Sequence, residues 1–330
     1  MLRIRIRLAL LFIACTAVWM LIGAALMALI HEPGIGAALG LIAGILYWTI
    51  ASLASERFVL DAYGAKLLGV DWAPNLTEVV RELSAKAGIP QPALYNVPLA
   101  APNAFAVGRK DAGPAIVLTN GLTKHLSQDE VRAVMALMIA RLKQPEAAAW
   151  PLAATIAGMP LWGVCLPGLR DFLKRWLPTD ATGLTVVDRI LLVMATPLSA
   201  FALWVVCDGR CVADADLFAC RLLGDSAPLE SALHKMEDKR PRTWWGRSPY
   251  NPATAMLFAV PPIRPLDGMD GDAELSFFRH TQWPFVAPLP STGQRHLPRH
   301  TATPTSPLPA PTASPAQPSD PLQSSVGRPV

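Results

Sequence analysis

The chain has 330 residues, which is enough for one or two domains with hydrophobic cores of their own. Hydrophobic residues make up 52% of it and charged residues only 16%, whereas a typical soluble domain is about 25% charged. This shift predicts membrane-spanning segments, while the net charge of +4 and the lack of a basic stripe with interleaved aromatic residues argue against a nucleic-acid partner.

Two long uncharged runs near the N-terminus predict a transmembrane hairpin over residues 1–55. Residues 8–30 and 33–55 are each 23 residues long, more than the ~20 that a helix needs to cross a bilayer. Only His31 and Glu32 separate them. A cleaved signal peptide fits the first run less well, because the apolar part of such peptides spans about 7–15 residues.

The arginines around this hairpin predict its orientation. Arg3, Arg5 and Arg7 precede the first run and Arg57 follows the second, whereas the connecting loop has no lysine or arginine. The positive-inside rule places such arginines in the cytoplasm. We therefore expect a multi-pass protein of the cell (inner) membrane, with the lipid bilayer as a partner and the soluble domain facing the cytoplasm.

Gly36, Gly40 and Gly44 recur every four positions in the second run. This spacing puts small residues on one helix face and lets another helix approach closely. We expect this face to pack against the first helix of the hairpin, with self-association of two chains as the alternative.

Residues 56–146 predict the first part of a soluble domain that mixes helices and strands. Ser127 and Glu130 have the spacing of a capping box, in which each side chain bonds the other residue's free backbone amide at a helix start. The expected elements are a helix capped by Asn75 that ends near Ala87, strands over 93–97, 104–107 and 115–119, and a helix from the capping box to about Lys143.

The next region, residues 147–207, predicts a second apolar hairpin. Residues 147–169 and 190–207 are uncharged, but the loop between them carries four cations, which the positive-inside rule disfavours on a translocated loop. The hairpin therefore either spans the membrane despite these charges or dips in from the cytoplasmic side. Residues 208–283 predict the second part of the soluble domain, with helices near 212–223 and 229–236, and the proline-rich residues 284–330 predict a disordered tail.

Six stretches along the chain form a series of landmarks: 58–65 (FVLDAYGA), 82–90 (ELSAKAGIP), 101–108 (APNAFAVG), 129–134 (DEVRAV), 215–224 (ADLFACRLLG) and, weakly, 251–255 (NPATA). In this order and register they resemble the HtpX-type membrane zinc metalloproteases. The resemblance covers about two-thirds of the chain. It implies an α+β, membrane-anchored, zincin-like metallopeptidase fold that is mainly α-helical, with a small sheet and about four transmembrane helices.

The same resemblance implies a zinc site whose residues are missing from this chain. In the family, the helix after the capping box carries H-E-x-x-H, where two histidines on one helix face bind zinc and the glutamate activates a water. Here Leu137 and Arg141 stand at the histidine positions, Met138 at the glutamate position, and Val212 at the position of the third ligand. None of these side chains can ligate zinc well, so we expect no bound zinc and no catalytic residues.

Two residual features could survive the loss of the metal. Asp216 is first of all read as a solvated carboxylate of its helix; the alternative is that Arg141 occupies the metal position and pairs with Asp216 or Asp214. Asn103, Ala104, Phe105 and Ala106 correspond to the family's edge strand beside the bound peptide. Strand addition uses main-chain groups, so this strand could still bind peptide, or it could now be only structural.

The sequence thus favours a proteolytically inactive HtpX-like homologue with a binding or regulatory role in membrane protein quality control. Unfolded membrane proteins or an active protease are the expected partners. Two alternatives remain: an active zinc metalloendopeptidase with non-standard ligands, and a structural membrane protein.

Overall fold

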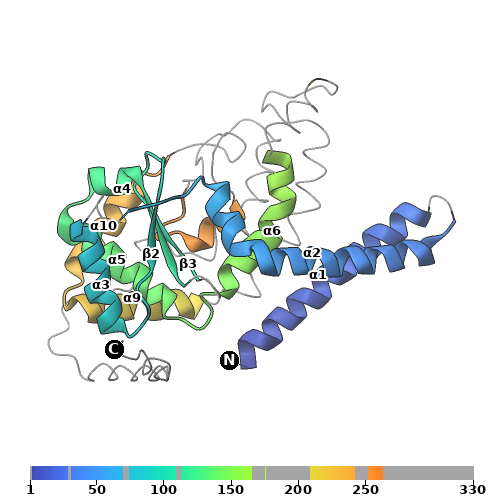
Figure 1. Cartoon of the computed structure of the whole chain (residues 1–330), viewed down its shortest axis with the longest axis horizontal. Helices are drawn as coiled ribbons and strands as arrows, with labels where there is room; N and C mark the ends of the chain where they lie inside the picture. The colour runs from blue at the N-terminus through green and yellow to red at the C-terminus, as the bar shows by residue number, and fades with distance from the viewer. Residues whose placement is uncertain are drawn as a thin grey trace, which may run out of the picture.

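A computed structural model describes residues 2–28, 31–69, 74–108, 113–165, 175, 209–241 and 252–262. Within these residues the chain is mostly helical, with one small mixed sheet. The paired helices α1 (Leu2–Ala28) and α2 (Pro33–Ala62) project from one side of the body that contains the sheet, and α6 (Ala149–Cys165) stands against α2 (Figure 1).

The helices α1 and α2 form the hairpin that the two apolar runs predict. Both are long and apolar enough to cross a membrane, and large side chains such as Leu21 and Leu53 are 70% and 81% exposed on them. Helix α2 continues without a break to Ala62, so the expected boundary at residue 55 lies inside it.

The glycine stripe of α2 is used inside the hairpin, as expected. A Cβ atom on Gly40 would lie 2.3 Å from the carbonyl oxygen of Trp19, and one on Gly36 would lie 2.2 Å from that of Gly23. Only glycine allows the two backbones to come this close. The stripe therefore sets the α1–α2 contact.

The sheet has four strands in the order β1-β2-β4-β3. Strand β1 pairs antiparallel with β2, β2 runs parallel to β4, and β4 pairs antiparallel with β3. Their bounds are β1 (Lys66–Leu67), β2 (Ala93–Val97), β3 (Ala104–Val107) and β4 (Ala115–Thr119). The last three agree with the strands predicted from the sequence, and β3 lies at one edge.

Alternate side chains of the strands enter two different hydrophobic cores. Phe105, Val107 and Val117 pack with residues of α1, α2 and α6, whereas Ala106 and Ile116 pack with the helices on the other face. Those helices are α3 (Pro74–Ala87), α5 (Gln128–Leu142), α9 (Gly209–Leu223) and α10 (Ala227–Asp238), and they gather on one side of the sheet (Figure 1). Because both faces are covered, every residue of β3 and β4 is buried.

The remaining described elements are α4 (Asn120–His125) and the short helix η3 (Pro252–Leu257). Helix α3 begins at Pro74, so Asn75 lies in its first turn rather than at its cap. The helix therefore starts earlier than expected, at a proline, which is well suited to the first position of a helix.

Helix α6 coincides with most of residues 147–169, the first arm of the expected second hairpin. It is tied to α2 by a hydrogen bond from the Tyr47 hydroxyl to the carbonyl oxygen of Ile156 (2.7 Å) and by one from Thr155 Oγ1 to that of Ser55 (3.4 Å). The second arm, residues 190–207, and the tail, residues 284–330, lie outside the described residues. The described part contains two candidate spans, so the expectation of about four stays a prediction.

Candidate functional site

Helix α5 carries the positions at which the resemblance places the catalytic motif. Its start is fixed by the predicted capping box: the Ser127 amide donates to the Glu130 carboxylate (2.8 Å), and the Glu130 amide donates to the Ser127 hydroxyl (3.4 Å). The helix ends at Leu142, next to Lys143, whose ammonium donates to the carbonyl oxygen of Ala87 at the end of α3 (2.7 Å). Both ends of α5 are thus held by side chains.

Glu130 also joins α5 to α10. Its carboxylate accepts hydrogen bonds from Lys235 Nζ (2.7 Å) and from the Ser231 hydroxyl (2.6 Å), although Glu130 is only 5% exposed. Burial acts to raise the pKa of Glu130, but the bonds from Lys235, Ser231 and the Ser127 amide outweigh it and lower this pKa to about 2. The carboxylate is therefore ionised at neutral pH and acts as a structural anchor.

The second half of α5 lies in the core beside the sheet and α9. Leu137 and Met138 are fully buried, and Arg141 is 1% exposed. These residues do not fit a zinc ion: an aliphatic side chain has no donor, a thioether is a weak one, and a guanidinium keeps its proton.

Arg141 instead binds main-chain oxygen atoms. Its Nη1 donates to the carbonyl oxygen of Phe258 (2.7 Å) and to that of Leu257 (3.2 Å). Charge-assisted bonds of this kind compensate for placing a cation in the core. The guanidinium thus fixes the last residue of η3 and the residue after it to the C-terminal half of α5.

The same residues run along the outer edge of β3. Phe258 forms an antiparallel bridge with Phe105, and the Ala259 amide donates to the carbonyl oxygen of Ala104 (2.8 Å). We call residues 257–260 the edge segment. The four positions predicted to bind peptide, Asn103 and three residues of β3, are buried, and the chain itself lies along the edge of this strand. Whether this edge binds another peptide stays a prediction.

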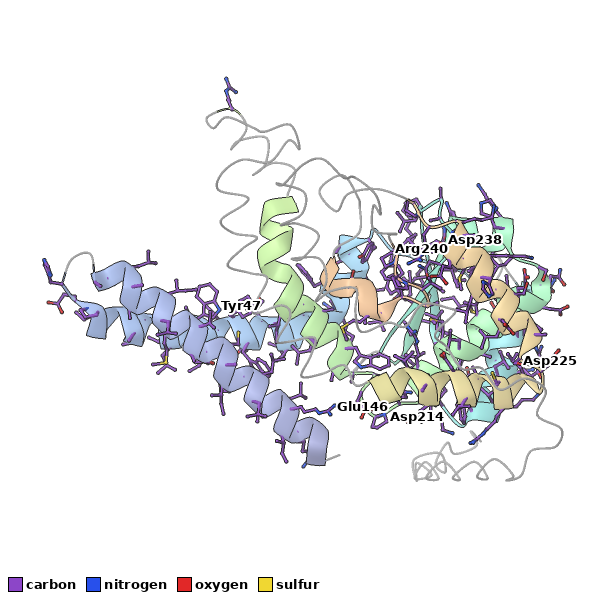
Figure 2. The ribbon with its side chains drawn as sticks, turned by 180° about the vertical axis from the view of Figure 1, so that it is seen from behind. Tyr47, Glu146, Asp214, Asp225, Asp238 and Arg240 are labelled. Atoms are coloured by element: carbon purple, nitrogen blue, oxygen red, sulfur yellow. The ribbon has the colours of Figure 1, made fainter. Side chains whose placement is uncertain are left out.

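Helix α9 carries the other predicted site residues and packs against α5. Val212 is half-buried, Asp216 is buried and Asp214 is exposed. Figure 2 shows Asp214 on the N-terminal half of α9 and Asp225 just beyond the other end of that helix. The pairing of Arg141 with Asp216 or Asp214 stays a prediction, because the contacts described above for Arg141 are those to the edge segment.

The thiol of Cys220 lies one turn after Asp216 on α9. Burial and then the charges of Asp216 and Asp225 raise the pKa of Cys220 to about 11. The thiol therefore stays protonated at neutral pH and is a poor nucleophile or metal ligand. Across the described ranges as a whole, no three His, Cys, Asp or Glu side chains are grouped so that they could hold a metal ion.

The structure thus brings Arg141 and the predicted edge strand together through a segment that the sequence reading did not single out. The sequence does contain a signal for it: residues 256–260 (MLFAV) form a short apolar run that ends at two prolines, which is typical of a buried strand end.

The sequence is similar to known peptidases. A model of "Peptidase family M48" matches residues 72–236. A protease HtpX homologue of Thermococcus sibiricus is 33% identical over 217 residues, which are 64% of this chain and 72% of that protein. The homologue of Methylibium petroleiphilum is 30% identical over 260 residues, 77% of this chain and 87% of that protein. No solved structure matches significantly. The chain therefore belongs to peptidase family M48 and to its HtpX type.

Proposed function

We propose that this chain is a membrane-anchored, HtpX-like pseudoprotease that binds or regulates other proteins in membrane protein quality control. The observation that carries this proposal is the buried Arg141, whose guanidinium donates to the main-chain oxygens of Leu257 and Phe258 where a metal ligand would be needed.

Peptide hydrolysis at a zinc site needs ligands for the ion and a base that takes a proton from water. Leu137 and Met138 can perform neither role. Arg141 cannot accept a proton, and a cation at this position repels a second one. The chemistry that remains at this turn is hydrogen bonding to carbonyl oxygens, which favours binding over cleavage.

The two candidate membrane-spanning helices support a position of this site next to a bilayer. With Arg3, Arg5, Arg7 and Arg57 on the cytoplasmic side, α1 and α2 span the membrane and the sheet with its helices lies in the cytoplasm. Unfolded segments of membrane proteins, or an active protease that handles them, are the partners that such a position fits.

The rival function is an active zinc metalloendopeptidase whose ligands lie elsewhere in the chain. The purified full-length protein and the Thermococcus sibiricus relative are incubated with casein in detergent, each with added zinc and with a chelator. We expect the relative to cleave casein and this chain to leave it intact in both conditions.

Cleavage by this chain that the chelator abolishes would contradict the proposal and establish the rival. To separate a binding protein from a purely structural one, the membrane-embedded chain is purified after mild crosslinking in cells. A binding role predicts crosslinked membrane proteins that are lost when residues 56–330 are replaced by an unrelated soluble domain.

A further inference from the structure

A hollow of about 200 Å³ opens between the first half of α3, the end of α4 and the first turns of α5. These helices lie on the face of the sheet opposite to the hairpin (Figure 1). Neither Leu137 nor Arg141 lines the hollow, and both are buried in the second half of α5. The hollow is therefore separate from the turn where the resemblance places the zinc ligands.

The inner wall of the hollow is made of aliphatic side chains. They come from α3, from the end of α4 and from α5, and they are Leu76, Val79, Leu126 and Val131. Leu126 is buried, but the other three are only half-buried, although they pack on the hydrophobic core beneath them. Hydrocarbon of a ligand would remove this surface from water, which favours binding roughly in proportion to the area covered.

The polar groups of the hollow lie at its mouth. Asn75, Thr123 and Gln128 are exposed there, and Arg132 is half-buried. A pocket with an aliphatic wall and a polar mouth accepts a molecule that is apolar at one end and polar at the other. A straight hydrocarbon chain suits such a wall, because it needs no hydrogen-bond partner along its length.

Arg132 sets the charge that the polar end of the ligand should have. Its Nη2 donates to Glu82 Oε1 (2.9 Å), and Lys86 Nζ donates to the same oxygen (2.7 Å), so two cations share one carboxylate. Within the described residues Glu82 is the one partner of the Arg132 guanidinium, whose five N–H groups can also serve a second acceptor. The other charged residues next to the hollow in sequence balance one another: Glu78, Arg81, Lys124 and Asp129. The mouth therefore favours an anionic head group.

The volume of the hollow limits the length of the hydrocarbon chain. Pockets for drug-sized ligands have about 300–1,000 Å³, so this hollow suits a smaller molecule. A methylene group is about as large as a water molecule, whose share of the liquid is about 30 Å³, so the hollow holds about six or seven carbons. A membrane lipid with two long chains exceeds this volume, and the hollow faces away from the hairpin.

We propose that this hollow binds a single-chain anionic amphiphile of about eight carbons, of which a medium-chain fatty acid is the simplest. The hydrocarbon lies between α3 and α5 against Val79 and Val131, and the anionic group binds Arg132 at the mouth. A carboxylate and a phosphate ester share this chemistry. The inference goes beyond the proposed function, because it needs neither the zinc positions nor a protein partner.

The first test locates the amphiphile and measures the length of chain that the hollow accepts. The full-length protein in lipid nanodiscs is irradiated with an octanoate that carries a diazirine at the end of its chain, and labelled residues are identified by mass spectrometry. We expect labelling on α3 and at the start of α5. Straight-chain carboxylates from butanoate to decanoate, at aqueous concentrations fixed by dialysis, should compete about fourfold more tightly per methylene and level off near octanoate.

The second test asks whether Arg132 binds the head group. Arg132→Gln should weaken competition by octanoate about fivefold and leave competition by octanol unchanged. Glu82→Gln should strengthen octanoate about threefold, because it removes the carboxylate that competes for Arg132. Lys86→Gln is the matched control: it removes the other cation bound to Glu82, but one that does not line the hollow, so octanoate should change by less than about twofold. Octyl phosphate, measured in the same way, distinguishes a preference for phosphate from one for carboxylate.

Two variants block the hollow. Val79→Trp fills it from α3, and Thr123→Trp closes its mouth from an exposed position if the first variant does not fold. Either variant should abolish labelling of α3 and α5. Labelling of α1 and α2 by probe dissolved in the bilayer should stay the same, which makes the hairpin an internal control.

Three results would overturn the inference. They are labelling confined to α1 and α2 in wild type, labelling of α3 and α5 that persists when the hollow is blocked, and competition by octanol that equals that by octanoate. Each of them leaves the proposed function untouched, since the casein assay and the crosslinked partners test that function separately.

Discussion

The two ends of α5 each carry a buried charged side chain, and the two charges have different kinds of hydrogen-bond partner. At the N-terminal end, the buried Glu130 carboxylate accepts hydrogen bonds from the half-buried Ser231 and the exposed Lys235 of α10 and closes a capping box. At the C-terminal end, Arg141 lies in the core and donates to main-chain carbonyl oxygens. The first arrangement fixes the start of the helix, and the second lies on the turn where the resemblance places the metal ligands. The start of α5 and its C-terminal turn are therefore held by different kinds of hydrogen bond.

The largest effect is expected from restoring the ligands. The variant Leu137→His, Met138→Glu, Arg141→His and Val212→Glu should bind about one zinc ion per chain if α5 and α9 still bring these positions together. Zinc is measured by elemental analysis of the purified protein. The triple variant that keeps Val212 is the control and should bind zinc more weakly. A folded quadruple variant without zinc contradicts the assumed alignment of the two helices.

Removing the Arg141 side chain should come next. Arg141→Ala leaves a cavity and takes a donor from two buried carbonyl oxygens, so we expect the free energy of unfolding to fall by about 3 kcal/mol. Arg141→Met fills most of the volume and should cost less. Denaturation in mild detergent, followed by tryptophan fluorescence, measures both. An Arg141→Ala protein as stable as wild type argues that these bonds do not hold the edge segment.

The difference between the two ends of α5 also explains what the sequence could predict. The capping box, the strands β2, β3 and β4, and the two long apolar helices α1 and α2 depend on local spacing or long apolar runs, and the structure confirms them. The carbonyl oxygens of Leu257 and Phe258, which bind Arg141, lie more than a hundred residues away in the chain and are backbone atoms. No residue type marks such backbone atoms, so the sequence could not predict these two bonds, and the predicted pairing of Arg141 with Asp214 or Asp216 stays a prediction.

Low pH is expected to weaken the interactions of Glu130 at the N-terminal end of α5. The pKa of Glu130 is about 2 in the folded chain and near 4.5 in an unfolded one. Its contribution to stability is therefore complete above about pH 4.5 and is lost as the pH falls toward 2. Between pH 6 and pH 3.5 we expect wild type to lose about 1 kcal/mol more than Glu130→Gln. Parallel losses in the two proteins would show that Glu130 is not linked to folding in this way.

The smallest effect is expected at Ser127. Its hydroxyl accepts the Glu130 amide at 3.4 Å, which is long for such a bond, and the opposite half of the capping box uses the Ser127 amide, which any residue but proline retains. We therefore expect Ser127→Ala to cost about 0.5 kcal/mol, at the low end for a helix cap. The same denaturation assay measures it, with Ser127→Thr as a control that keeps the hydroxyl.

The most direct test of the central claim is the zinc content of the unaltered protein. The full-length chain is expressed in zinc-supplemented medium, purified in detergent without chelator, and its zinc is counted against that of the Thermococcus sibiricus relative prepared in the same way. With Leu137, Met138 and Arg141 on the relevant turn, we predict no zinc above background. About one zinc ion per chain would contradict the account.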